Sequence, residues 1–138
     1  MGIPTKALFT HAEAVGTLPL VRAIVSDLVA DFRALRTAGR ERRALAGEPP
    51  LSGPETQALE EHVRSLSDRV EGYLRELLAL GLEVRDLELG SVDFPTLMGS
   101  EPAFYCWRLD EPTIAFWHAA DQAHRERVPI AGAAVSVP

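Results

Sequence analysis

The sequence has only one cysteine, Cys106, among its 138 residues. A single cysteine cannot form a disulfide bond within the chain, and this pattern favours a reducing compartment. No stretch approaches the roughly 18 consecutive apolar residues that a membrane-spanning helix needs. We therefore expect a cytoplasmic protein with no membrane partner.

The sequence also lacks an excess of positive charge. It has 14 lysines and arginines against 20 acidic residues, a net charge of −6, so the chain as a whole repels nucleic acid. Four arginines do cluster at positions 36–43, but cations are favourable at the end of a helix without any ligand. Gly90 and Gly99 fit no phosphate-binding loop or dinucleotide pattern. We expect no nucleic-acid partner.

The remaining composition is that of an ordinary folded protein, with 46% hydrophobic and 25% charged residues. The length predicts a single domain over residues 1–138, which is enough to bury a core without disulfides or a structural metal. Helical patterns occupy about residues 10–80, and extended patterns occupy about residues 82–130.

The first helical signal is a capping box. Thr10 and Glu13 have the spacing at which each side chain reaches the backbone N–H of the other residue. Gly16 and Pro19 interrupt this pattern, and proline disrupts the interior of a helix. We therefore predict a short N-terminal helix, followed by a second helix that begins at Pro19.

This second helix and the one after it are both long and amphipathic. Apolar residues at helical spacing over 20–35 predict a helix that ends near Ala38 or continues to Ala46. The next helix starts near Pro54 and ends at Gly81, which suits a left-handed cap. Its apolar residues alternate in steps of four and three, as in a heptad seam: Leu59, Val63, Leu66, Val70, Tyr73, Leu77 and Leu80. The two helices should form an antiparallel hairpin.

The C-terminal third predicts a small antiparallel sheet, which gives an α+β fold. Residues 103–109 and 113–117 are rich in aromatics and are joined by a turn at 110–112. If Leu109 faces Thr113, then Phe104 faces His118, Cys106 faces Phe116 and Arg108 faces Ile114. The residues on one face of the sheet would then be Phe104, Cys106, Arg108, Ile114, Phe116 and His118.

Short motifs throughout the chain resemble a bacterial family described only as domain of unknown function 2203. They are Phe9-Thr10-x-x-Glu13-Ala14, Leu18-Pro19-Leu20, Gly81-x-Glu83-Val84-Arg85-Asp86, Val92-Asp93-Phe94-Pro95, Cys106-Trp107-Arg108-Leu109, Glu111-Pro112, Trp117-His118 and Arg127-x-Pro129-Ile130. The chain departs from the family pattern at Asp110, where the family has glycine. It departs again at 121–124, where the family has Asp-x-Gly-Phe. The resemblance implies no activity.

The polar residues interleaved with the aromatics predict a site for a small molecule or anion. Arginine side chains and a tryptophan wall are typical of pockets that hold a carboxylate or phosphate group. The predicted ligand-binding residues are Asp93, Trp107, Arg108, Glu111, Trp117, His118, Asp121 and Arg127. A polar network that only joins the sheet to the helices would use the same residue types.

Three other functions remain open. The metal-ligand types His118, Asp121, His124 and Cys106 permit a metal site, and a Cys106–His118 pair would permit nucleophilic catalysis. Alternatively, the protein is a non-catalytic assembly protein that forms a homodimer through its long helices. The sequence decides neither the cofactor nor whether the protein is an enzyme.

Overall fold

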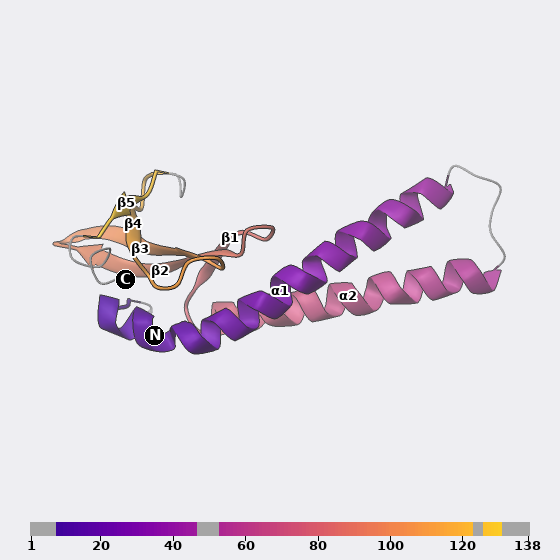
Figure 1. Cartoon of the computed structure of the whole chain (residues 1–138), viewed down its shortest axis with the longest axis horizontal. Coiled ribbons are helices and arrows are strands. Elements are labelled where there is room, and N and C mark those ends of the chain that lie inside the picture. The colour runs from indigo at the N-terminus through magenta and orange to yellow at the C-terminus, as the bar shows by residue number, and fades with distance from the viewer. Residues whose placement is uncertain (1–7, 47–52, 123–125, 131–138) are drawn as a thin grey trace, which may run out of the picture.

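The computed structural model describes residues 8–46, 53–122 and 126–130. The described part is α+β, as predicted, with two long helices packed together and a five-stranded antiparallel sheet (Figure 1). The elements are α1 (His11–Ala46), α2 (Gly53–Ala79), β1 (Glu83–Asp86), β2 (Ser91–Met98), β3 (Glu101–Arg108), β4 (Phe116–Ala119) and β5 (Val128–Pro129).

The capping box at the start of α1 is confirmed. The Glu13 N–H donates to Thr10 Oγ1 at 3.0 Å, and the Thr10 N–H donates to Glu13 Oε1 at 2.9 Å. Phe9, just before the cap, is joined to β2 because its N–H donates to the carbonyl of Pro95 at 2.8 Å. These bonds fix the first turn of α1 against the sheet.

The prediction of a short first helix and a new helix at Pro19 is wrong. α1 is one helix of 36 residues with Pro19 inside it, and it continues to Ala46. Proline removes one backbone hydrogen bond from the helix. Leu18 and Val21, on either side of it, are buried, so packing against the rest of the protein outweighs that loss. Figure 1 shows α1 changing direction within its first turns, as a proline inside a helix would cause.

The seam predicted for α2 lies inside the helical hairpin. Val63, Leu66, Val70 and Leu77 are buried within the single chain. The helix ends at Ala79, Gly81 follows with a φ of 90°, and the Leu82 N–H donates to the Leu77 carbonyl, as in a Schellman cap. Because the seam is already covered by α1, a homodimer through these helices stays a prediction.

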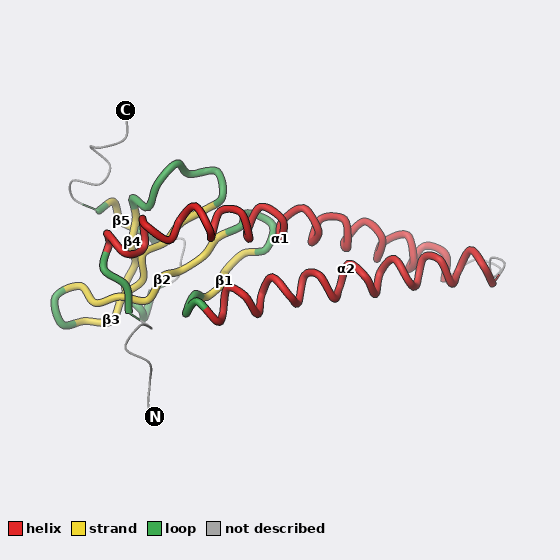
Figure 2. The backbone as a smooth tube through the Cα atoms, turned by 90° about the horizontal axis from the view of Figure 1, so that it is seen from below, coloured by secondary structure: helices red, strands yellow, loops and turns green. Residues whose placement is uncertain are grey.

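The hairpin extends beyond the sheet as an arm (Figures 1 and 2). Near the sheet its helices join the main core, but farther out only a small cluster is buried between them, formed by Ala38, Val63 and Leu66. No described helix is long and apolar enough to cross a membrane.

The strands follow one another in the sheet in chain order, β1-β2-β3-β4-β5. The predicted pairing of β3 with β4 is confirmed where the ladder exists, because Phe104 pairs with His118 and Cys106 pairs with Phe116. The ladder does not reach Ile114, which instead is buried in the core on the helix side. The carbonyl of Ile114 contacts the ring of His11 at 2.7 Å, and this contact holds it near α1.

Only one face of the sheet packs on the helices. Side chains alternate between the faces of a strand, and Val92, Phe94 and Trp107 share the main core with Val21 and Val25 of α1. The turn between β1 and β2 also rests on α1, where Gly90 has a φ of 68° and no room for a side chain. The opposite face of the sheet is therefore left for other residues.

Candidate functional site

The sheet face away from the helices brings together three residues with reactive side chains. Asp93 of β2 pairs with Cys106 of β3, and His118 of β4 pairs with Phe104, the residue two places before Cys106. All three are buried, with exposed fractions of 0%, 0% and 2%. One ligand atom from each lies within 4.8 Å of the others. We call Asp93, Cys106 and His118 the central cluster.

Hydrogen bonds fix the orientation of the His118 ring. Its Nδ1 lies 2.9 Å from the carbonyl oxygen of Ala119, and because a carbonyl can only accept, Nδ1 carries a proton. Its Nε2 lies 2.8 Å from Asp93 Oδ2, which also accepts a hydrogen bond from Arg85 Nε at 2.7 Å. One proton must then lie between Nε2 and Oδ2, because neither atom can otherwise donate to the other.

The second oxygen of Asp93 is different. Oδ1 is buried and has no hydrogen-bond partner in the described part of the chain. A buried carboxylate oxygen without a partner loses its hydration and gains nothing in exchange. The central cluster therefore contains an acceptor that the protein itself does not satisfy.

Two arginines lie beside the cluster and stack on phenylalanine rings. Arg85 lies over the ring of Phe104 at 5.0 Å and pairs with Glu83 as well as Asp93. Burial alone would lower the pKa of Arg85, but its hydrogen bond to Asp93 and the nearby negative charges raise it. Arg85 therefore carries its positive charge at neutral pH.

The second arginine, Arg127, lies over Phe116 at 3.9 Å and pairs with Glu111. One of its nitrogens, Nη1, is 3.9 Å from the sulfur of Cys106. Burial raises the pKa of the Cys106 thiol to about 11, and the charge of Asp93 raises it too, while Arg127 acts in the opposite direction. In this structure Cys106 is a thiol at neutral pH, which is unlike the activated cysteine of a nucleophilic enzyme.

Glu111 uses both of its oxygens on this face. Oε1 accepts the backbone N–H of Arg108 at 3.0 Å, and Oε2 accepts from Arg127. The guanidinium of Arg108 forms no ion pair with an acidic side chain in the described ranges. Its Nε is buried without a hydrogen-bond partner there.

The comparisons with known proteins place the chain in a family. Residues 7–130 match the model of the family described as "Uncharacterized conserved protein (DUF2203)". The chain belongs to the DUF2203 family. No curated protein and no solved structure matches it. The motifs that carry the resemblance of this DUF2203 chain supply every residue of the central cluster, together with Arg85, Arg108, Glu111 and Arg127.

Some predicted site residues of the DUF2203 chain lie elsewhere. Trp107 is on the helix face, fully buried, where Arg22 of α1 lies 5.1 Å from its ring. Its Nε1 donates to the Glu111 carbonyl at 3.0 Å, so Trp107 belongs to the core. His124, a predicted metal ligand, lies outside the described residues.

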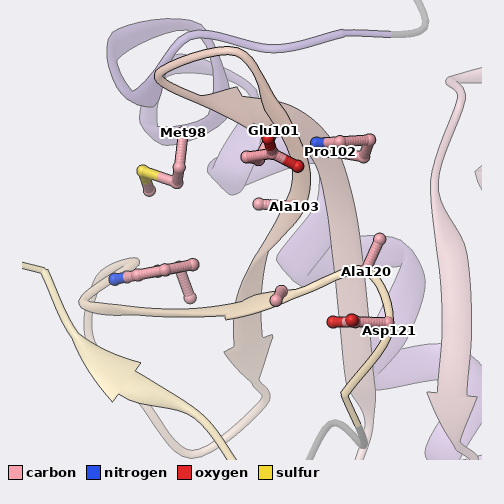
Figure 3. Close-up of a pocket in the computed structure, with 8 residues that line it drawn as sticks. Met98, Glu101, Pro102, Ala103, Ala120 and Asp121 are labelled. Carbon is pink, nitrogen blue, oxygen red and sulfur yellow. The ribbon is translucent and has the colours of Figure 1, made fainter.

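Trp117 and Asp121 line a separate open depression of about 500 Å³ on the helix-side face of the sheet (Figure 3). Figure 3 shows Met98 and Asp121 on opposite sides of it, with Glu101 and Pro102 at its rim. Its lining includes two carboxylates and no arginine or lysine. The structure therefore does not combine the predicted tryptophan wall with the predicted arginines, and it puts Asp93 rather than Asp121 beside His118 and Cys106.

The sequence prediction missed Arg85 and Ser91. Arg85 was visible as part of an alternating strand, and its pairing with Asp93 follows once β1 pairs with β2. Ser91 pairs with Arg108 across β2 and β3, and its hydroxyl lies near the Cys106 sulfur without a hydrogen bond of ordinary geometry. Nothing in the local sequence marked Ser91 as part of a site.

Proposed function

We propose that the protein binds a transition-metal ion, with Zn²⁺ as the best fit, through Asp93, Cys106 and His118. A thiolate, an imidazole and a carboxylate are together a ligand set that zinc accepts. The support is the buried convergence of three such donors from three neighbouring strands. Cys106 and His118 were among the metal ligands that the sequence suggested, whereas Asp93 takes the place of Asp121.

The orientation of His118 supports this proposal. Histidines that bind a metal through one ring nitrogen usually donate the other N–H to a carbonyl or carboxylate, which fixes the ring. His118 makes this contact through Nδ1 to Ala119, and it presents Nε2 to the cluster. A metal ion bound at Nε2 would replace the proton that lies between Nε2 and Asp93.

The observation that carries the proposal is the unpartnered Oδ1 of Asp93 within this cluster. A cation is the natural partner for a buried carboxylate oxygen that accepts no hydrogen bond of ordinary geometry. Three protein ligands also leave one position of a tetrahedral site for water or a substrate, as in catalytic rather than structural zinc sites. A metal bound in this way would act as a Lewis acid on that fourth ligand.

The neighbouring arginines limit the affinity. Arg85 already binds Asp93, and Arg127 lies close to Cys106, so each competes with a cation for the charge of a ligand. Glu83 and Glu111 offset these two positive charges. We therefore expect binding weaker than that of sites built from four cysteines.

The test is metal analysis of the purified protein together with cobalt substitution. After loading with Zn²⁺ or Co²⁺ and dialysis, we expect one equivalent of metal, and the cobalt form should show a sulfur-to-cobalt absorption band. Cys106→Ser should abolish that band, and His118→Ala should release the metal. His62→Ala is the matched control, because His62 is exposed on α2.

Circular dichroism of each variant separates loss of metal from loss of fold. A folded wild-type protein that retains no zinc or cobalt after loading would refute the proposal. Equal metal retention by folded wild-type, Cys106→Ser and His118→Ala proteins would refute it as well. Native mass spectrometry of the same samples reports whether the predicted homodimer forms.

A further inference from the structure

The three arginines on the helix-free face of the sheet differ in how their charges are compensated. Arg85 pairs with two carboxylates, and Arg127 pairs with Glu111. Arg108 is partly exposed and has no acidic side chain within ion-pair distance among residues 8–46, 53–122 and 126–130. Its positive charge is thus the one on this face that the described residues leave uncompensated.

Two acids of this face are already engaged by other donors. Glu111 gives one oxygen to the backbone N–H of Arg108 and the other to Arg127. Asp93 accepts from Arg85 and His118 through a single oxygen. Arg108 Nε–H is therefore a buried donor with no acceptor in the described chain, and such groups in native proteins call for a specific partner.

A second donor lies directly across the ladder. Ser91 of β2 pairs with Arg108 of β3, so their Cβ atoms are about 5 Å apart on the same face. The Ser91 side chain is fully buried, and its hydroxyl also lacks a hydrogen-bond partner of ordinary geometry. Two adjacent buried donors, one of them charged, lack what an oxyanion provides: several acceptor oxygens and a negative charge.

We propose that Arg108 and Ser91 bind a small oxyanion, the carboxylate, phosphate or sulfate group of a ligand, beside the central cluster. Cys106 is two residues from Arg108 along β3, on the same face, so the anion and the cluster lie next to each other. The anion site goes beyond the metal proposal and does not depend on it. The unpartnered acceptor in the cluster suits a cation, and the unpartnered donors beside it suit an anion.

The experiment titrates acetate, phosphate and sulfate separately into the full chain, with chloride keeping the ionic strength constant. Binding is followed by the nitrogen–proton NMR signal of Arg108 Nε, which is identified by its loss in Arg108→Lys. We expect a saturable shift in the wild-type protein. Saturation by acetate alone identifies a carboxylate ligand, and saturation by phosphate or sulfate identifies a tetrahedral oxyanion.

Variants connect the binding to the two donors. In Arg108→Gln the affinity, read from backbone signals of β2 and β3, should fall about tenfold or more, the effect of losing a charge-assisted hydrogen bond. Ser91→Ala should weaken it by a smaller factor. Arg40→Gln is the control, since Arg40 is an exposed arginine of α1, and it should bind as the wild-type protein does.

Running each titration on chelator-treated and on zinc-loaded protein separates the two proposals. Saturable binding without metal supports the anion site even if no metal ever binds. Absence of saturable shifts with all three anions, in both states, would overturn the anion site while leaving the metal proposal intact. Equal affinities of folded wild-type and Arg108→Gln proteins would overturn it as well.

Discussion

The buried thiol of Cys106 should make the stability of the metal-free protein depend on pH in the alkaline range. Burial, followed by the charge of Asp93, raises the pKa of Cys106 from 9.0 to about 11 in the folded protein. Between these values the unfolded chain releases a proton that the folded protein keeps. The free energy that this difference contributes is fully present below pH 9 and is lost as the pH rises through about 11.

The size of the effect follows from the same two values. Each pH unit between the folded and unfolded pKa corresponds to about 1.4 kcal/mol, so the difference of about two units amounts to roughly 3 kcal/mol. This is a large part of the roughly 5–15 kcal/mol that stabilises a typical domain. It should therefore be measurable by chemical denaturation.

The assay is urea unfolding, followed by tryptophan fluorescence, at a series of pH values from 7 to 11.5 with a chelator present. Cys106→Ala and Cys106→Ser lack the thiol but keep every other titrating group, so lysines and tyrosines affect all three proteins alike. The stability of the wild-type protein should fall relative to both variants above pH 9. If the three curves stay parallel over the whole range, the thiol is not held in its protonated form and the reasoning is refuted.

Three further predictions concern the fold. Gly90→Ala should destabilise the protein by several kcal/mol more than Gly99→Ala, and thermal unfolding compares the two variants. Both glycines have positive φ, but a Cβ at Gly90 would lie 2.9 Å from a valine methyl carbon of α1, whereas one at Gly99 meets nothing within 4 Å. Thr10→Ala removes half of the capping box and should cost about 1 kcal/mol in urea unfolding, and an unchanged midpoint would contradict this role. Asp31→Asn breaks the ion pair with Arg69, whose hydrogen bond lowers the pKa of Asp31. The free energy of unfolding should fall by no more than about 1 kcal/mol, and high salt should reduce the difference from the wild-type protein.

The fold class was predictable because its signals are local. The steps of four and three along α2, the glycine at its end and the alternating strands each depend on neighbouring residues only. The failure at Pro19 has a tertiary cause, since local chemistry disfavours proline inside a helix and only the burial of its neighbours offsets that cost. The sequence does not show which surfaces of the folded protein will pack against a helix and stabilise it.

The candidate site was predictable in part. The pairing of Phe104 with His118 followed from the turn between their strands, and it put Cys106 on the same face. The position of Asp93 required the register of β2 with β3, which the two-residue turn at Gly99 fixes. Proximity along the chain favours Asp121 as a partner of His118, whereas the register of β2 with β3 brings Asp93 beside Cys106.

The arm formed by α1 and α2 divides the molecule into parts of unequal local stability. With 36 residues, α1 is about 54 Å long, and its outer third is held by the small cluster around Ala38 and by exposed ion pairs such as Arg42–Glu60. Segments with few buried contacts open at a lower free energy than the core does. The outer turns of α1 and α2 should therefore exchange their amide hydrogens early, while the strands that hold the central cluster exchange only on global unfolding. Substitutions in these outer turns would leave the chemistry of the sheet untouched.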